Sequence, residues 1–238
     1  MVEVTDLTKS FNGTTVLDID RLTIADGDFV GLLGNNGAGK TTLFRLMFDL
    51  LRPDTGAVTI DGVGVAGTEP WKAHSGVYLD SSFLIDYLTP EEFFYFIGKT
   101  YGMSRADVDA RLDTFVQFMN GEILGTHKFI RAMSMGNKQK TGIIAAMLHT
   151  PRLLVLDEPF NFLDPSSQIC IKEMLAGYAA STGATVVISS HNLNHTIDVC
   201  TRVLLLEKGH IIKDLRPADD GSRRELEEYF NIKEKNYA

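Results

Sequence analysis

The chain has 238 residues, of which 44% are hydrophobic and 23% are charged, and its formal net charge is −8 with a sequence pI of about 5.2. This composition is typical of a soluble globular protein with one well-packed core and argues against a disordered chain. The acidic balance argues against a broad electrostatic surface for nucleic acid or for anionic lipid.

Targeting and membrane signals are absent from the sequence pattern. No apolar run approaches the roughly 20 residues that cross a bilayer, and residues 1–6 lack the basic and apolar regions of an export signal. Cys170 and Cys200 form no C-x-x-C pair, so neither a zinc site nor a disulfide framework is indicated. We therefore expect a cytoplasmic protein with no membrane span of its own.

The first 60 residues predict two kinds of strand. Alternating apolar residues, separated by Asn-Gly and Asp-Gly turns, predict half-buried strands within residues 2–30 and again at 57–60, which together form an antiparallel layer. Residues 29–33 form a short continuous apolar run, as in a buried parallel strand. Residues 43–48 predict a helix.

A glycine-rich loop joins that parallel strand to that helix. Residues 34–42 read G-N-N-G-A-G-K-T-T and match G-x-x-x-x-G-K-[ST] at every fixed position. Such a loop directs backbone N–H groups at phosphates, and the helix adds its positive N-terminal end. We expect Lys40 to bridge the β- and γ-phosphates of a bound nucleotide and the Thr41 hydroxyl to ligate Mg²⁺. The residues predicted to bind nucleotide here are Asn35, Asn36, Gly37, Ala38, Gly39, Lys40, Thr41 and Thr42. The alternative, an accidental glycine-rich turn, does not account for the flanking strand and helix.

The middle of the chain, about residues 81–150, predicts a helical lobe. Thr89 before Pro90 is a helix start, and Ser104 opens a second helix whose apolar residues continue at helical spacing to Met119. A third helix is predicted over residues 136–148. This lobe is inserted between two halves of an α/β core.

The core resumes after the lobe. Residues 153–156 and 185–188 are continuous apolar runs, as expected of parallel strands that are covered on both faces. Residues 201–238 predict a hairpin around Lys208 and Gly209, then a helix opened by a capping box at Ser222. The predicted fold is α/β: a P-loop NTPase core with a mixed, largely parallel sheet, an N-terminal antiparallel β layer and the inserted helical lobe.

Two carboxylates follow the strand at 153–156. Asp157, at the strand end, is placed to reach the Mg²⁺ of a bound nucleotide, whereas Glu158 extends toward the γ-phosphate and can polarise an attacking water. Two ordinary surface acids are the alternative, but carboxylates beside a phosphate site need a cation between them.

With both motifs in view, the chain resembles the ATP-binding subunit of an ATP-binding cassette transporter over nearly its whole length. Residues 160–164 (F-N-F-L-D) resemble that family's D-loop, residues 189–191 (S-S-H) its switch histidine, and residues 133–137 (M-S-M-G-N) stand where its signature L-S-G-G-Q belongs. The segment that begins Glu158-Pro159 is most similar to single-cassette exporters of peptides, lantibiotics or drugs. The resemblance implies ATP hydrolysis with the catalytic residues Glu158, His191 and Lys40.

Further site residues follow from the same resemblance. It implies nucleotide contacts from Val16, Ser134, Gly136 and Asp164, and adenine stacking on Phe11, for which a plain core phenylalanine is the alternative. His191 follows an apolar strand, so it is expected at the same sheet edge as Asp157, where it can donate to the γ-phosphate. A zinc pair of His191 with His195 is the weaker alternative, because Asn192 is no general base.

The sequence departs from the family pattern at three places, one of which is Phe11, where tyrosine is commoner in the family. Met133, Met135 and Asn137 replace the usual signature residues, and Asp80 replaces the Q-loop glutamine. Asp80 remains a predicted ligand of Mg²⁺, beside Thr41 and Asp157. Because of these departures, one alternative function is a nucleotide-dependent regulatory module that hydrolyses little ATP. The other alternative is a soluble cassette ATPase that acts on ribosomes or DNA.

Two partners are expected. Ser134 and Gly136 lie at a helix N-terminus, which is a second anion site, and a helix of about 18 Å separates it from the strand leading to Asp157. The signature is therefore predicted to cap ATP held by a second ATP-binding subunit. Aromatic residues at 83, 87 and 93–96 predict an exposed docking groove for a transmembrane permease subunit, unless these rings only fill the lobe.

Overall fold

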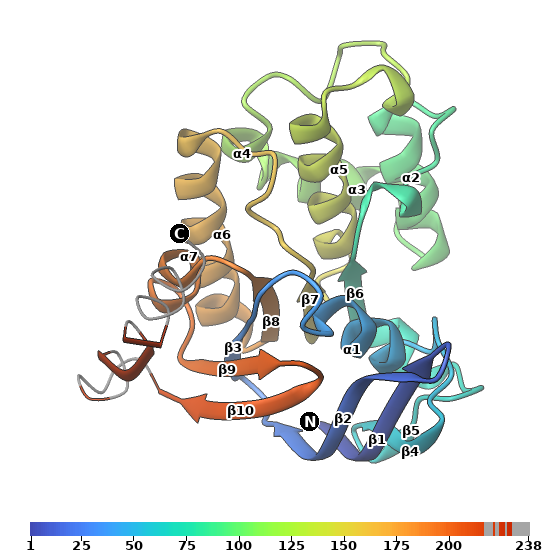
Figure 1. Cartoon of the computed structure of the whole chain (residues 1–238). Helices are drawn as coiled ribbons and strands as arrows, with labels where there is room; N and C mark the ends of the chain where they lie inside the picture. The colour runs from blue at the N-terminus through green and yellow to red at the C-terminus, as the bar shows by residue number, and fades with distance from the viewer. Residues whose placement is uncertain (217–220, 222–223, 227, 230–238) are drawn as a thin grey trace. The chain divides into compact units, whose positions relative to one another are not determined.

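Figure 1 shows the computed structural model of the chain, which describes residues 1–216, 221, 224–226 and 228–229. Two compact units make up the chain: residues 1–71 with 185–238, and residues 72–184. The capping box predicted to begin at Ser222 lies outside the described residues. Within the described part, no helix is both long and apolar enough to cross a bilayer.

The first unit contains the predicted antiparallel layer. Its four strands have the order β2-β1-β4-β5, with the bounds β1 Val2–Phe11, β2 Thr14–Ile24, β4 Thr55–Ile60 and β5 Val63–Gly64. Asn12 and Gly13, with φ of 51° and 79°, form the two-residue turn of the first hairpin. This part of the prediction is confirmed.

A second sheet in the same unit is mixed and largely parallel. The strands run in the order β10-β9-β3-β8, and β3 is parallel to both of its neighbours while β10 is antiparallel to β9. Their bounds are β3 Phe29–Leu33, β8 Thr185–Ser190, β9 Arg202–Glu207 and β10 His210–Leu215, and the helices of this unit are α1 Lys40–Met47 and α7 Leu193–Ile197. Every residue of β3 and β8 is buried, which explains their continuous apolar runs.

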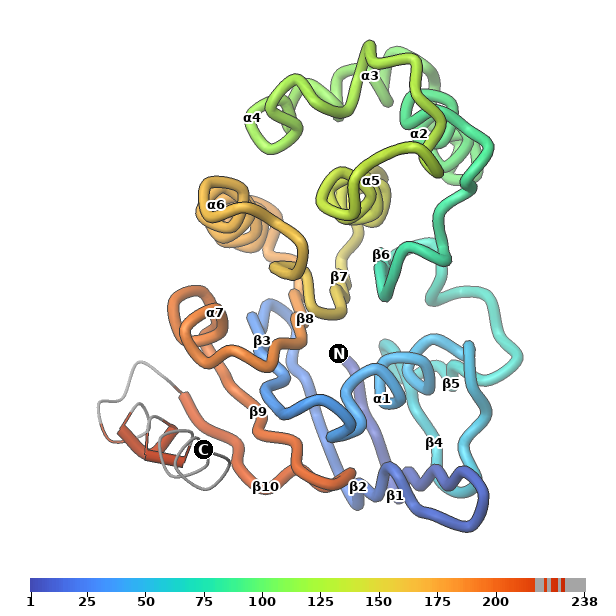
Figure 2. Tube along the Cα trace, turned by 45° about the horizontal axis from the view of Figure 1, so that its top comes forward, coloured from blue at the N-terminus to red at the C-terminus, as the bar shows by residue number. Residues whose placement is uncertain are grey.

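The second unit contains the helical lobe and one parallel strand pair. The strand β6 (Ser75–Tyr78) pairs with β7 (Leu153–Leu156). Its helices are α2 Pro90–Thr100, α3 Arg105–Asp113, α4 Val116–Met119, α5 Met135–Met147 and α6 Pro165–Thr182, and the chain also forms the 3-10 turns η1 Pro70–His74, η2 Ser81–Phe83 and η3 Ile130–Ala132. Figure 2 shows α5 and α6 end-on, because their axes run roughly parallel.

The predicted helix starts are confirmed, but one predicted helix is divided. Thr89 and Ser104 each accept a hydrogen bond from the backbone three residues later and form capping boxes. The helix predicted from Ser104 to Met119 ends at Asp113 and restarts at Val116. The Thr114 hydroxyl donates to the carbonyl of Arg111 (2.7 Å) and also accepts from the Arg111 guanidinium (3.4 Å), so local side-chain bonding competes with the helix there.

Candidate functional site

The glycine loop lies at the carboxyl end of β3. Gly37 and Gly39 adopt φ of 82° and 111°, a region that favours glycine. Gly39 is also the N-cap of α1 and has no side chain that could occupy the first-turn N–H groups. These groups therefore remain directed at the loop, where a phosphate chain fits.

Lys40 is held inside the loop. Its side chain is only 6% exposed, and Nζ donates to the carbonyls of Gly34 (2.6 Å) and Asn35 (3.3 Å). The cation is thus fixed at the first turn of α1, next to Thr41 and Thr42. A positive charge at this position suits the β- and γ-phosphates of ATP.

The predicted sensor histidine lies at the neighbouring strand end. The N–H of Gly34 donates to the carbonyl of Ser190, the last residue of β8, at 3.1 Å. His191 follows directly and its side chain is exposed. The structure therefore brings His191 to the same edge as the glycine loop, as predicted from the two apolar strands.

The base-binding predictions fall on exposed or half-buried side chains of the same unit. Phe11, at the end of β1, is 45% exposed, and Lys9 Nζ lies 5.6 Å from its ring centroid. The alternative of a core phenylalanine is therefore wrong. Val16 is half-buried on β2, and a Cβ on Gly39 would lie 2.9 Å from its carbonyl oxygen, so β2 passes directly along the glycine loop.

In the second unit, β7 ends in the two predicted carboxylates. Asp157 is 5% exposed, and its N–H donates to the carbonyl of Tyr78 at 2.9 Å, which aligns it with the end of β6. Glu158 is half-buried and adopts a φ of 48°, a conformation that non-glycine residues seldom take. Backbone strain of this kind is concentrated at functional sites.

Gln139 of α5 is a contact that the motifs did not reveal. It is 6% exposed, its Nε2 donates to the carbonyl of Glu158 (3.1 Å), and its Oε1 accepts from the Tyr78 hydroxyl (3.3 Å). Burial raises the pKa of Tyr78, so this hydroxyl stays protonated and able to donate. No local signal in the sequence marks this glutamine, because both of its partners are distant along the chain.

The position of Gln139 shows that the length of α5 does not separate the signature from Glu158. The helix α5 leads away from the signature and β7 returns, so the first turns of α5 contact the backbone at Glu158. The length of the helix therefore does not keep the signature away from the catalytic segment of its own chain. As a result, the length of α5 does not support the prediction of a second subunit.

The predicted signature residues begin α5. The Ser134 hydroxyl caps the helix by accepting from the N–H of Asn137 (3.2 Å). A Cβ on Gly136 would lie 2.7 Å from the carbonyl oxygen of Phe162, so glycine permits close contact between the signature and the D-loop segment. The side chains of Met135 and Phe162 are 46% and 63% exposed.

Two predicted site carboxylates are helix N-caps. Asp80 accepts from the N–H of Ser82 (2.8 Å) as the N-cap of η2. Asp164 is the N-cap of α6 and accepts from the hydroxyl of Ser166 (2.5 Å) and from the hydroxyl of Ser167 (2.6 Å). These hydrogen bonds hold the pKa of Asp164 well below its usual range.

The residues predicted to ligate magnesium carry hard oxygen donors. Asp157 and Asp80 offer carboxylate oxygens and Thr41 a hydroxyl oxygen, which are hard ligands of the kind Mg²⁺ prefers, and ATP phosphates would supply the others. His195, the second histidine of the weaker zinc alternative, is half-buried on α7. Among the described residues, no three His, Cys, Asp or Glu side chains group as a metal site.

Comparison with protein families decides the assignment. Residues 17–161 match the family model described as ABC transporter. The chain belongs to the ABC transporter family. It is an ATP-binding subunit of an ABC transporter, and it hydrolyses ATP.

Two relatives illustrate the similarity. This ABC transporter subunit is 33% identical over 213 residues to an uncharacterised ABC transporter ATP-binding protein, YdbJ of Bacillus subtilis, covering 89% of this chain and 68% of the relative. It is 31% identical over 238 residues to the bacitracin transport ATP-binding protein BcrA of Enterococcus faecalis, covering 98% of this chain and 74% of the relative.

Solved structures agree on the fold. An ATP-binding subunit of an ABC transporter is 30% identical with a TM-score of 0.79, over 95% of this chain and 93% of the other. A dimeric ATP-binding cassette, MJ0796, bound to ADP and Pi, has a TM-score of 0.81 at 22% identity, over 91% of this chain and 99% of the other. The predicted P-loop NTPase fold is confirmed.

Proposed function

We propose that this ATP-binding subunit drives export through a separate transmembrane permease, at the inner face of the cell membrane. In this proposal residues 1–238 form one nucleotide-binding domain, and residues 81–150 are its helical lobe. The relative named for bacitracin transport supports a transport role, and the exporter-like segment at Glu158-Pro159 supports the direction.

One observation carries the proposed mechanism. A buried strand ends in Asp157 and Glu158, and Gln139 of the signature helix binds the backbone of Glu158. Glu158 takes up a proton from the attacking water, and His191 donates to a γ-phosphate oxygen. Lys40 holds the phosphates in place.

Magnesium belongs to this proposal as well. Thr41 and Asp157 would hold it, with Asp80 as a third ligand, and the bound ion would neutralise charge on the phosphate oxygens. The residues that we assign to nucleotide contact are Phe11, Val16, the loop residues 35–42, Ser134, Gly136 and Asp164.

A second ATP-binding subunit completes the proposed site. The exposure of Met135 in the signature and of Phe162 in the D-loop segment supports a protein partner at this surface. The Ser134 hydroxyl and the first N–H groups of α5 then meet the γ-phosphate of ATP bound to the other subunit. Two Mg·ATP would be enclosed between the subunits.

Glu158→Gln tests the catalytic role. The variant is expected to bind ATP normally, to lose turnover by about 100-fold or more, and to sediment as a dimer with Mg·ATP, because general-base catalysis is lost while the binding groups remain. Asp113→Asn changes one charge on an exposed residue of α3 and should leave turnover and sedimentation unaltered. Undiminished turnover of Glu158→Gln, or a monomer at saturating Mg·ATP with the permease present, contradicts the proposal.

The permease would dock on the exposed aromatic side chains that follow β6. Phe83, Tyr87 and Phe96 are 44%, 72% and 49% exposed, whereas Phe93 and Phe94 fill the lobe core. Tyr87→Ser should weaken co-purification with the permease and retain ATP binding. Val116→Ser, at a 57% exposed position on α4, is the matched control. Equal permease yield with both variants would exclude this surface.

A further inference from the structure

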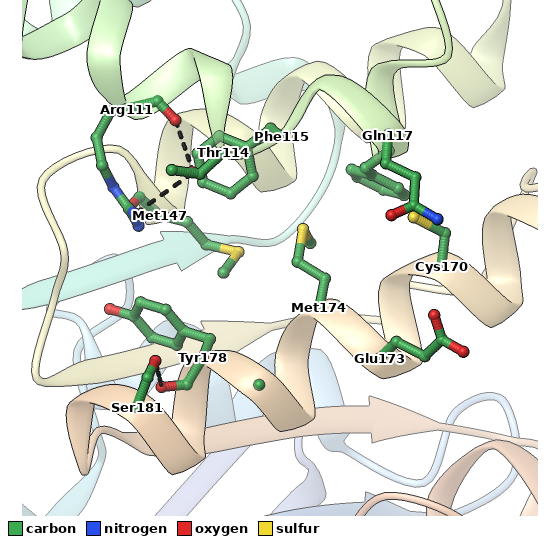
Figure 3. Close-up of a pocket in the computed structure, with 12 residues that line it drawn as sticks. Arg111, Thr114, Phe115, Gln117, Met147, Cys170, Glu173, Met174, Tyr178 and Ser181 are labelled. Carbon is green, nitrogen blue, oxygen red and sulfur yellow. Dashed lines mark hydrogen bonds between the residues drawn. The ribbon is translucent and has the colours of Figure 1, made fainter.

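A cavity of about 450 Å³ lies within the second unit, between α3 and α4 on one side and α6 on the other (Figure 3). The side chains of Phe115, Phe118, Met147, Met174 and Tyr178 form the apolar part of its lining, and about half of the lining is polar. Its volume is in the range of small-molecule sites in proteins. None of its lining residues is among the residues assigned above to nucleotide binding or catalysis.

Gly177 keeps the α6 side of this cavity open. The cavity-lining positions of α6 follow helical spacing over 170, 173, 174, 177, 178 and 181, so Gly177 is at the middle of this face. A Cβ built at Gly177 has no atom within 4 Å, so packing does not require glycine. Glycine is a poor residue for a helix interior. Here it leaves room that a larger side chain would fill.

A cation borders the cavity at one end. The Arg111 guanidinium is half-buried against Phe115, 5.1 Å from the ring centroid, and it donates to the carbonyls of Met147 (3.2 Å) and Leu148 (3.3 Å). Within the described residues no carboxylate pairs with it. Burial lowers the pKa of Arg111, which reflects the cost of an incompletely solvated charge. An anion beside it would offset that cost.

The other end of the cavity has the opposite charge. Figure 3 shows Glu173 at the far side from Arg111, with its carboxylate directed away from the guanidinium. The cavity thus offers a positive end, an apolar middle and a solvent-exposed acidic rim.

We propose that this cavity binds a small amphipathic organic anion, with its anionic group at Arg111 and its apolar body between Met147 and Met174. Charge complementarity and the open face at Gly177 select this occupant. The site is separate from the one that binds ATP.

The experiment uses a fluorescent probe and its uncharged analogue. The probe is 8-anilinonaphthalene-1-sulfonate, which carries a sulfonate on an aromatic body, and the analogue N-phenyl-1-naphthylamine lacks the sulfonate. Both are titrated against the whole chain at saturating Mg·ATP, so that the nucleotide site is filled. Saturable binding of the sulfonate, about ten-fold tighter than that of the analogue, is expected. Absence of saturable binding, or equal affinity for the two probes, overturns the proposal.

Variants on α6 locate the bound probe. Gly177→Leu should weaken binding of the sulfonate probe by at least about ten-fold, since the leucine side chain fills the cavity. It should not lower the thermal unfolding temperature, since leucine favours the helix more than glycine does. Ala176→Leu places the same side chain at the exposed neighbouring position and should bind like the wild type. Unchanged binding by Gly177→Leu, or equal weakening by both variants, refutes the site.

A charge variant tests the polarity of the cavity. Glu173→Gln should bind the sulfonate about two- to three-fold more tightly, because a repelling carboxylate is removed from the rim. Asp113→Asn makes the same charge change outside the cavity and should not alter the affinity. If the two variants respond alike, the charge arrangement assigned to the cavity is wrong.

Discussion

Replacing Gly142 by alanine places a methyl group against the ring of Tyr78. The new Cβ would lie 2.0 Å from Cε2 and 2.4 Å from both Cδ2 and Cζ. Carbon atoms in favourable contact are about 3.5–4.0 Å apart, so α5 and the ring would have to separate by roughly 1.5 Å. Tyr78 is 2% exposed and hydrogen-bonded to Gln139, and it has no room to withdraw.

The magnitude follows from two opposing terms. Alanine gains about 1 kcal/mol over glycine in a helix interior, whereas overpacking a well-packed core costs about 1–3 kcal/mol and occasionally more. Because the overlap is with a held aromatic ring, we expect the upper end of that cost and a net loss of about 1–2 kcal/mol. The free energy of unfolding is measured by urea titration followed by circular dichroism.

Gly177→Ala on α6 is the matched control. It makes the same substitution in another helix interior, where a Cβ meets no atom within 4 Å. It should therefore stabilise the protein by about 0.5–1 kcal/mol. If Gly142→Ala is as stable as the wild type, or if the two variants shift stability in the same direction, the packing argument is refuted.

Four further predictions concern the site and its support. Lys40→Met should abolish ATP binding in equilibrium dialysis while leaving the circular dichroism spectrum unchanged, because the phosphate cation is lost together with two loop hydrogen bonds. Retained affinity would contradict its role. Gln139→Leu should lower the free energy of unfolding by about 1–3 kcal/mol, since the Tyr78 hydroxyl and the Glu158 carbonyl lose their partner. It should also reduce the ATP turnover rate more than the affinity for ATP. An effect on stability alone would show that Gln139 does not position the catalytic segment. Burial lowers the pKa of His149 to about 4 from its ordinary 6.5. Between these two pH values the unfolded chain binds a proton on this side chain and the folded chain does not. The free energy of unfolding should therefore fall by up to about 1.4 kcal/mol for each pH unit as the pH is lowered from 6.5 to 4. His149→Phe, which keeps a ring stacked on Tyr101, should lose this slope, and an unchanged slope would contradict the assignment. Asp164→Ala should be less stable than the wild type at pH 7, and the difference in free energy of unfolding should shrink as the pH falls below 3.8. The reason is that the hydrogen bonds to the carboxylate stabilise the fold only while Asp164 is ionised. A difference that does not change with pH would argue against this cause.

The elements that could be predicted from the sequence are those determined by residues close together in the chain. The glycine loop follows from a fixed pattern of glycines and Lys40, and the strands β3, β7 and β8 follow from continuous apolar runs. The helix starts at Thr89 and Ser104 follow from capping residues. In each case the residues within one turn or one strand determine the outcome.

The rest depends on contacts between distant segments. Nothing local distinguishes Gln139 from a surface glutamine, because its partners are 61 and 19 residues away. The helix α6 was not predicted, although Asp164 followed by Pro165 is an N-cap signal and Ile171, Leu175 and Tyr178 recur at helical spacing. The division of α3 from α4 escaped prediction because the apolar spacing continues across Thr114.

The hydrogen bonds around Gln139 have a mechanical consequence. Tyr78 abuts α5 at Gly142, its hydroxyl holds Gln139, and Gln139 holds the main chain at residue 158. A displacement of the chain just after β6, where the proposed docking side chains begin, would therefore reach the backbone of Glu158 through these two hydrogen bonds. In the proposed transporter, a single amide side chain would link movement at the permease-docking segment to the residue proposed to activate water.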